Sequence, residues 1–381
     1  MRVLHIAETA QGGVGSYLEE VVPLQARRYG PGCVRVVLPD EHARHFPRLS
    51  REWLSVFPVE GVTRTRAALR MARLALKEAA LWEPDVVHLH STFAGFMMRP
   101  LLAAWHPMAR IVYCAHGWAF DRDAGALQTA LACHCERVLS RWCDRVLCVS
   151  QHELARAREL GIEAGRLQLV RSGINAQPPA QREQTPYRPW PPGVLRVLFV
   201  GRLDRQKGVD ILYAAMSRLG ARGFAVVVGS RVAGGDCSAC AAPANVLHVG
   251  WRSRDEIEAL YASADVLVVP SRWEALGLVA LEAMRAGLPV VASRVGGLPE
   301  VVEDRRTGRV IEPENPGLLA EVLSGLDEPA LRRMGACARE RFLQRFQVER
   351  LIDELDQAYC SLPPQPAVRP ARPAAYGSER P

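Results

Sequence analysis

Two glutamates, Glu274 and Glu282, have a spacing that could hold two sugar groups of one ligand. The first lies in a short loop after the apolar run Val266–Val269, and the second lies about one turn inside the helix predicted next. Carboxylates are good acceptors for vicinal hydroxyls, because each contact is a charge-assisted hydrogen bond. A sugar could therefore bind Glu274 and a ribose could bind Glu282. Two solvated glutamates on a surface helix explain the spacing equally well.

The start of that helix is suited to a phosphate. We expect the helix to begin near Gly277, so that the N–H groups of Leu278 and Val279 point out of its first turn. These groups have no partner within a helix, and the helix dipole adds partial positive charge there. Glu282 would lie roughly 6 Å along the axis from Leu278. A diphosphate at the helix start would thus lie between the two glutamates.

A basic loop follows the apolar run Leu195–Val200. It contains Arg202 and Lys207 between Gly201 and Gly208. Two cations there could neutralise a diphosphate, most strongly as it becomes a leaving group. The loop is not a Walker A loop, because five residues separate Gly201 from Lys207 and glycine follows the lysine in place of Ser or Thr. A solvated basic loop is the alternative.

Further candidates follow strands of the first half and one strand of the second. His116 follows the run Ile111–Ala115, where a histidine can donate to a phosphate or a sugar hydroxyl. His88 and His90 share one strand face, and only His90 is near enough to the strand end to face an acceptor. Trp251 follows the run Val246–Val249, and we expect it beside a nucleotide base.

These candidates all follow apolar runs of strand length that alternate with helical patterns. Most runs are apolar throughout, which is typical of parallel strands buried on both faces. The alternation predicts doubly wound α/β sheets. Besides the runs already named, strands are expected at Val3–Ala7, Val34–Leu38, Val86–Leu89, Val146–Val149, Leu167–Val170, Ala225–Val228 and Val290–Ala292. Helices are expected at Val14–Tyr29, Arg66–Leu81, Glu153–Leu160, Arg254–Ala262 and Val348–Tyr359.

The chain of 381 residues is long enough for two domains. A proline-rich stretch interrupts the alternation once, which predicts a domain at 1–176, a linker at 177–193 and a second domain at 194–345. The helix within 346–361 could cross back to the first domain. We expect 362–381 to be a disordered proline-rich tail. Ligands of open α/β sheets bind at the carboxyl ends of the strands, so the site is expected between the domains.

Composition excludes several classes of protein. No apolar run approaches the ~18 residues of a membrane helix, and the first residues resemble a strand rather than a signal peptide. We therefore expect a cytoplasmic protein with reduced thiols among its ten cysteines. Cys237 and Cys240 form a C-x-x-C pair, but no second pair completes a zinc site. The net charge of +7 fits an anionic small molecule, an anionic membrane or nucleic acid.

One helix could contact a membrane. Arg66, Arg70, Arg73 and Lys77 form a basic stripe beside a face of alanine and leucine. A basic amphipathic helix can lie on an anionic membrane, whereas a solvated helix that covers its own sheet is the alternative. Alanine dominates the apolar face, which favours the alternative. No known nucleic-acid-binding motif accompanies the basic residues, so we expect no nucleic-acid partner.

The motifs together resemble the retaining glycosyltransferases of family GT4, which have the GT-B fold. The resemblance is carried by Gly201–Gly208, by Glu274 and Glu282, and by three further segments: Glu282–Val291, Gly296–Glu300 and Thr307–Gly308. In the first half, Gly12-Gly13-Val14 and Asp144–Ser150 match it. The implied fold is two Rossmann-like domains that face each other across a cleft. Ala275-Leu276 replaces a common Pro-Phe, and Asn175 replaces a frequent Asp.

The resemblance implies a function and roles for the site residues. It implies transfer of a sugar from a nucleotide-diphosphate sugar with retention of configuration, Glu274 orienting the sugar and Glu282 holding the ribose. Gly12 and Gly13 would close on the donor phosphate, and His116 would lie near the transferred sugar. There is no Asp-x-Asp motif at a strand end, so no metal and no other cofactor is expected; Arg202, Lys207 and the helix start at Leu278 would stabilise the leaving group.

The acceptor and two alternatives stay open. A lipid-linked or polysaccharide-precursor hydroxyl at the inner face of the cell membrane is the expected acceptor. A nucleotide-sugar 2-epimerase can share the fold, and it would act on the donor alone. A non-catalytic nucleotide-sugar-binding protein is the second alternative, but it would not need all of Arg202, Lys207, Glu274 and Glu282.

Overall fold

The computed structural model describes two parallel sheets that are flanked by helices. The described residues are 1–10, 12–44, 46, 48–105, 109–123, 125–177, 189–230 and 242–361. The fold class predicted from the sequence is confirmed: both sheets are parallel throughout and alternate with helices along the chain. Most of the linker, the Cys237/Cys240 pair and the tail 362–381 lie outside the described residues.

The amino-terminal sheet has seven strands in the order β3-β2-β1-β4-β5-β6-β7. Its strands are β1 (Val3–Ala7), β2 (Val34–Pro39), β3 (Leu54–Phe57), β4 (Val86–His90), β5 (Arg110–Cys114), β6 (Arg145–Cys148) and β7 (Leu167–Leu169). The helices of this half are α1 (Gly13–Tyr29), α2 (Asp40–Ala43), α3 (Arg64–Trp82), α4 (Thr92–Trp105), α5 (Ala126–Leu139) and α6 (Gln151–Glu159). Strand β3 was not predicted, because it lies at the sheet edge and is only partly buried.

The carboxy-terminal sheet has six strands in the order β10-β9-β8-β11-β12-β13. Its strands are β8 (Leu195–Val200), β9 (Gly223–Val228), β10 (Val246–Gly250), β11 (Val266–Val269), β12 (Val290–Ser293) and β13 (Gly308–Ile311). The helices are α7 (Val209–Leu219), α8 (Arg254–Ser263), α9 (Leu278–Arg285), α10 (Leu298–Val301), α11 (Pro316–Ser324) and α12 (Glu328–Arg345). Both sheets reverse their strand order once, next to β1 and β8, and such a point is where open α/β sheets bind ligands.

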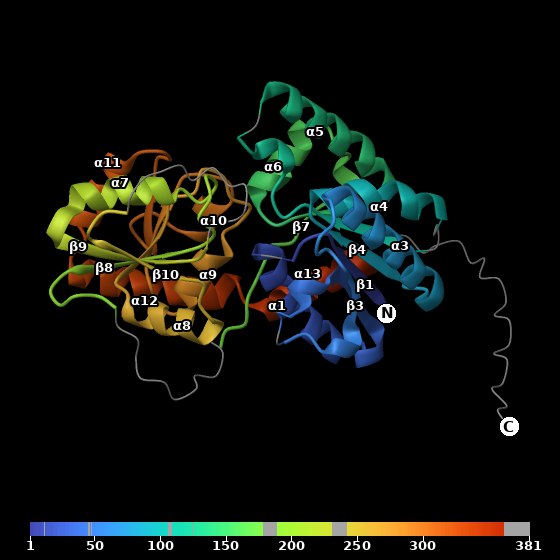
Figure 1. The fold of residues 1–381 in the computed structure, drawn as a ribbon, viewed down its shortest axis with the longest axis horizontal. Helices are drawn as coiled ribbons and strands as arrows, with labels where there is room; N and C mark the ends of the chain where they lie inside the picture. The colour runs from blue at the N-terminus through green and yellow to red at the C-terminus, as the bar shows by residue number, and fades with distance from the viewer. Residues whose placement is uncertain are drawn as a thin grey trace.

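The last described helix, α13 (Val348–Cys360), lies on the amino-terminal domain beside α1 (Figure 1). The Tyr359 hydroxyl is 2.7 Å from Nδ1 of His88, and Arg110 donates to the Tyr359 carbonyl at 2.7 Å. The chain therefore returns to its first domain after it has built the second. One continuous apolar cluster includes residues of strands β1 and β4, of helix α13 and of the strands of the second sheet.

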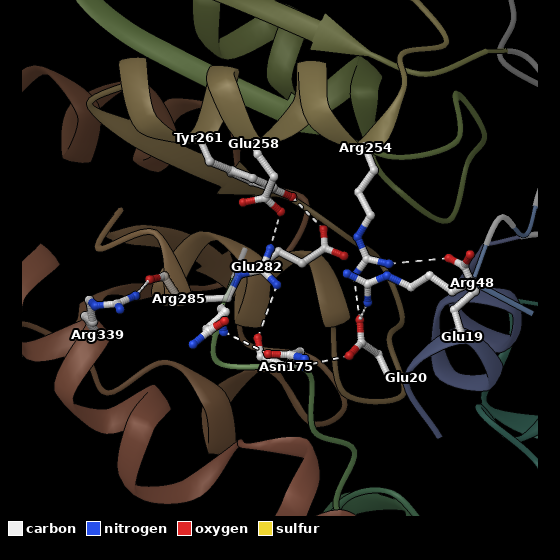
Figure 2. A network of polar contacts seen from close by, with 11 residues as sticks. Glu19, Glu20, Arg48, Asn175, Arg254, Glu258, Tyr261, Glu282, Arg285 and Arg339 are labelled. Carbon is white, nitrogen blue, oxygen red and sulfur yellow. Dashed lines mark hydrogen bonds and ion pairs between the residues drawn. The ribbon is translucent and has the colours of Figure 1, made fainter. Parts of the chain in front are cut away.

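The two domains are joined by a buried polar network around Glu20 (Figure 2). Glu20 on α1 accepts from Arg48 at 2.9 Å and from Arg254 on α8 at 2.5 Å. Its other oxygen accepts from the backbone N–H of Asn175 at 2.8 Å. The Asn175 carbonyl in turn accepts from Arg285 at 3.3 Å. One carboxylate thus ties together the first domain, the second domain and the segment that connects them.

A second contact crosses the domains at the start of α6. Glu300 on α10 accepts from the backbone N–H groups of Gln151 and His152, both at 2.9 Å. These N–H groups have no partner within their own helix, and a carboxylate there also interacts favourably with the helix dipole. The helix start of one domain is therefore capped by the other.

Helix α3 covers its sheet with small residues. Ala68, Ala72, Ala75 and Ala79 are buried, whereas the stripe of Arg66, Arg70, Arg73 and Lys77 is exposed. None of the helices in the described ranges combines the length and the apolar content that crossing a bilayer requires.

We predict that Glu20→Gln destabilises the protein far more than the same change on the surface. Arg48 and Arg254 would lose their ion pair with Glu20, although Arg254 keeps Glu19 at 3.4 Å, and breaking a buried ion pair costs about 3–5 kcal/mol. Glu328→Gln is the matched control, because Glu328 pairs with Arg332 on the surface and such pairs are worth about 1 kcal/mol or less. Thermal melting of both variants measures the difference. Equal melting temperatures would contradict the role given to Glu20.

Candidate functional site

Two loops meet where the second sheet reverses its strand order. One runs from Gly201 to Gly208 after β8, and the other runs from Pro270 to Gly277 after β11. A Cβ added at Gly208 would lie 2.1 Å from the Pro270 carbonyl oxygen, so only glycine permits this approach. Gly208 also has a φ of +67°, which glycine adopts at little cost. The two motifs predicted to hold the diphosphate and the sugar are therefore packed against each other.

An ion pair joins the two loops at their centre. Lys207 Nζ lies 2.5 Å from Oε2 of Glu274, and Ser271 Oγ lies 3.3 Å from the same oxygen. Both charged side chains are mostly buried, at 17% and 11% exposure. Lys207 is one of only two lysines among the 48 Lys and Arg residues of the chain. This position therefore has a compact ammonium group, whereas nearly all other basic residues of the chain are arginines, which have a larger guanidinium.

The remaining polar groups hold these loops in place. Arg202 contacts Asp204 at 2.9 Å and Gln206 at 2.7 Å, and its side chain is 44% exposed. Arg272 binds both oxygens of Asp210 at 2.9 and 2.6 Å, and this raises the pKa of Arg272 further. Arg202 is therefore the more accessible cation of the two, whereas Arg272 has a structural role.

The helix start at Gly277 has the geometry that the sequence predicted. Gly277 has a φ of +93°, and a Cβ there would meet Leu298 at 2.6 Å. Helix α9 then begins at Leu278, so the first N–H groups of Leu278 and Val279 lie directly after the Glu274 loop. This is the arrangement that binds a phosphate.

Glu282 lies further along α9 within the polar network of Figure 2. The Tyr261 hydroxyl donates to Glu282 Oε2 at 2.9 Å, and burial raises the pKa of Tyr261 well above its ordinary value. The negative charges of Glu20 and Glu282 both stabilise the positive charge of Arg254, and together they raise the pKa of Arg254. Glu282 is therefore held by Tyr261 close to the contact between the domains.

Trp251 lies at the end of β10, the edge strand of the second sheet, and 68% of it is exposed. Two strands separate it from β11. Its place beside a nucleotide base therefore stays a prediction.

The turn that carries His116 lies near the Glu274 loop. It has a φ of +53° and is followed by Gly117 with a φ of +114°. A Cβ added at Gly117 would lie 3.7 Å from Cβ of Ala275, the neighbour of Glu274. Asp123, seven residues after His116, forms an ion pair with Arg205 of the Gly201–Gly208 loop. The His116 turn of one domain therefore lies against the Glu274 loop of the other.

Gly12 and Gly13 lie at the start of α1, and both are exposed. Gly12 has a φ of +71°, and a Cβ added at either residue would meet no described atom within 4 Å. Open space of this kind leaves room for a ligand beside the backbone. The tight position is instead Gly15, where a Cβ would lie 2.0 Å from the Ala10 carbonyl oxygen.

Glu153 is a positioning residue that sequence reasoning missed. It is buried on α6, and it accepts from the Gly117 N–H at 2.6 Å and from the Val149 N–H at 2.8 Å. Burial raises the pKa of Glu153 to about 7. It therefore fixes the turn that carries His116. Ser150 caps the same helix three residues earlier, so a Ser-x-x-Glu pattern was available as a signal.

Buried histidines extend from His116 into the first domain. His116 Nε2 lies 2.9 Å from Nδ1 of His90, and His90 Nε2 lies 2.9 Å from Nδ1 of His5. Burial lowers the pKa of His5 and of His116 to about 4, and it lowers the pKa of His90 well below its ordinary value. The expectation that His90 faces an acceptor is wrong, because the side chain is fully buried and contacts His116 instead.

Two family descriptions match this chain, one in each domain. Residues 181–341 match a family described as Glycosyl transferases group 1, and residues 11–178 match Glycosyltransferase Family 4. The glycogen synthase of Mycobacterium tuberculosis is 32% identical over 311 residues, which cover 77% of this chain and 72% of that protein. The D-inositol 3-phosphate glycosyltransferase of Nocardiopsis dassonvillei is 30% identical and is covered to 74%.

A relative of similar mass matches almost end to end. It is an uncharacterized 41.2 kDa protein in the cps region of Klebsiella pneumoniae, 27% identical over 95% of this chain and 100% of its own. Among solved structures, Anabaena Alr3699/HepE in complex with UDP-glucose has a TM-score of 0.74 at 20% identity, with 95% of this chain and 100% of that chain covered. Likeness at that identity supports the fold.

We predict that Gly208→Ala damages the site beyond the cost of its backbone conformation. Gly61 is the matched control, because it has a similar φ of +66° but no described atom within 4 Å of an added Cβ. Gly61→Ala should cost only the left-handed strain of about 1–2 kcal/mol. Gly208→Ala should cost more and should also weaken ligand binding, because the Pro270 loop must move. Melting temperatures that fall equally in both variants would contradict the packing of the two loops.

Proposed function

This chain belongs to the family 4 glycosyltransferases, and we propose that it moves a sugar from a nucleotide-diphosphate sugar to a hydroxyl acceptor with retention of configuration. The observation that carries the proposal is the contact between three groups of the right chemistry. Lys207 and Glu274 form an ion pair directly before the start of helix α9, and the His116 turn lies against the same loop. A cation, a carboxylate and a helix start thus converge at the strand ends of both domains.

The diphosphate would bind between Arg202, Lys207 and the N–H groups of Leu278 and Val279. Positive charge at that position stabilises the leaving group more strongly as its charge develops. Lysine has three donor hydrogens, so Lys207 can keep its contact with Glu274 and still donate to a phosphate oxygen. Leaving-group stabilisation of this kind uses only side chains and backbone of the chain.

The sugar and the ribose would bind the two glutamates. Glu274 would accept from sugar hydroxyls, with Lys207 and Ser271 fixing its carboxylate. Glu282 would accept from the ribose hydroxyls, with Tyr261 fixing its orientation. Gly12 and Gly13 would close over the phosphate from the first domain. His116 would contact the transferred sugar from the opposite side.

The transfer is proposed to take place on one face of the sugar. The bond between the anomeric carbon and the phosphate oxygen breaks, and the acceptor oxygen forms a new bond to the same carbon. The departing phosphate oxygen takes the proton of the acceptor hydroxyl, so the nucleoside diphosphate leaves and configuration is retained. This route needs no protein nucleophile.

The comparisons indicate which donor to test first. Anabaena Alr3699/HepE, which shares the fold, was solved with UDP and with UDP-glucose. UDP-hexoses are therefore the first donors in a panel that also includes GDP and ADP sugars. For the acceptor we propose a carbohydrate or lipid-linked precursor at an anionic membrane. The exposed basic stripe of α3 and the exposed Leu127 and Leu131 of α5 support a surface contact of the first domain.

We predict that Lys207→Ala and Glu274→Gln lower turnover by about 10²–10³-fold, the usual effect of removing one group that stabilises developing charge. Lys207→Arg should not restore activity, because a guanidinium cannot occupy the same small space. The matched controls are Lys77→Ala and Glu312→Gln, both exposed and distant in sequence. Sugar transfer is measured with a labelled donor and an acceptor panel. The product anomer reports retention.

Donor stabilisation is measured in the same proteins. A ligand at 100 times its dissociation constant adds about 2.7 kcal/mol of stability. Wild-type turnover in both Lys207→Ala and Glu274→Gln would refute the site. Conversion of the donor sugar without acceptor would identify an epimerase, and binding without transfer or hydrolysis would identify a non-catalytic protein.

A further inference from the structure

A cluster of three histidines under helices α1 and α13 lies outside the donor site. His5 is on β1, and His88 and His90 are two residues apart on the neighbouring strand β4. The register places His5 opposite His88, so all three side chains lie on the same face of the sheet. All three residues are completely buried. The cluster is not apparent in the sequence, because 83 residues separate His5 from His88, its partner in the strand register.

One nitrogen of each ring points to a common place. The three ligand atoms lie within 4.8 Å of one another, and His5 Nδ1 and His90 Nε2 are 2.9 Å apart. Two nitrogens bound to the same tetrahedral zinc ion are about 3.3 Å apart, since each Zn–N bond is about 2.0–2.1 Å. A shift of a few tenths of an ångström would bring these two nitrogens to that spacing, and the His88 nitrogen would have to approach them by at most about 1.5 Å.

The other nitrogen of each ring is held by a neighbour. His5 Nε2 lies 2.7 Å from Gln25 Oε1, His88 Nδ1 lies 2.7 Å from the Tyr359 hydroxyl, and His90 Nδ1 lies 2.9 Å from His116. Metal-binding histidines almost always have their second nitrogen bonded in this way, because the bond fixes the tautomer and the ring orientation.

One ring nitrogen of His88 is left without a hydrogen bond in the described part of the chain. This atom, Nε2, is buried. A buried polar atom without a partner costs about 1–3 kcal/mol. A bound ion would satisfy this nitrogen together with the facing nitrogens of His5 and His90.

We propose that His5, His88 and His90 bind one zinc ion through Nδ1, Nε2 and Nε2, in a site separate from the donor site. Three neutral imidazoles without a carboxylate suit zinc and its transition-metal neighbours, whereas magnesium and calcium require oxygen ligands. The fourth position of a three-histidine site is open to a water molecule. Because the ligands are fully buried, the ion enters as the first domain folds.

The ion would also determine the tautomer of His116. With its Nε2 on the metal, His90 has its proton on Nδ1 and donates to His116 Nε2. The proton of neutral His116 is then on Nδ1. Without the ion, the Gln25 carbonyl oxygen holds the proton of His5 on Nε2, His90 donates from Nε2 to His5, and His116 donates from Nε2 to His90. The two states therefore give opposite tautomers at the domain contact.

The experiment measures metal in the protein as it is purified. Untagged protein from zinc-supplemented cells is passed over a column in EDTA and analysed by mass spectrometry of the elements. We expect about one zinc per chain in the wild type and in the control His134→Gln, which changes an exposed histidine on α5. His88→Gln should lose the metal. Cells grown with cobalt in place of zinc should give protein with visible d–d absorption.

Two further measurements use wild-type protein, so they depend neither on whether the His88→Gln variant folds nor on transferase activity. Wild-type protein from zinc-limited cells should melt at a lower temperature than zinc-replete protein. The ¹⁵N shifts of the His116 ring should change between the Nδ1–H and Nε2–H tautomers. Less than a tenth of an equivalent of any transition metal in the wild type, with no effect of zinc on melting, would overturn the site and leave a metal-free hydrogen-bonded chain. Stabilisation by UDP-sugars would persist in that case.

Discussion

One buried carboxylate lies at the centre of the polar contact between the two domains. Glu20 binds Arg254 of the second domain, Arg48 of the first and the backbone of Asn175 in the connecting segment. Removing a charge from water is costly unless partners surround it, so these three groups must stay together for Glu20 to remain buried. Helix α1 begins at the glycines that would cover the phosphate, and α8 supplies the arginine beside Glu282. The Glu20 contact therefore helps to hold the two halves of the proposed donor site at their observed distance.

In the second domain, the positive charge of Lys207 and a close approach of two backbone loops occur together at the proposed site of the leaving group. An arginine in place of Lys207 would add a planar group between two loops that already touch through Gly208 and Pro270. In a chain with two lysines among 48 Lys and Arg residues, one lysine is found where these two loops are packed against each other. Steric room, as well as charge, thus determines the residue type at this position.

Much of the fold followed from the sequence, and the reasons are physical. Long apolar runs predicted the central strands, because a parallel strand covered on both faces has no polar residues to obscure it. Strand β3 escaped prediction because it is an edge strand with Leu54 and Val56 partly exposed. The motif loops around Lys207 and Glu274 were found because their glycines and charges are close in sequence.

The groups that sequence reasoning missed come from distant segments or from packing between domains. Glu20 resembles any polar residue of a surface helix, and its burial arises only when the second domain docks. His5 and His88 meet only through strand register. Asn175, where the family often has Asp, uses its backbone N–H and carbonyl in the network, so the substitution leaves that contact intact.

The presence of only two lysines permits a direct test of the proposed donor site. Protein labelled with ¹³C at the lysine Cε positions should give two signals, one from the exposed Lys77 and one from the ion-paired Lys207, and the Lys77→Arg variant assigns them. Titration with UDP-glucose and other nucleotide sugars is followed in both signals. The account predicts that a bound donor shifts the Lys207 signal and leaves Lys77 unchanged. A donor that stabilises the protein against heat but leaves the Lys207 signal in place would contradict it.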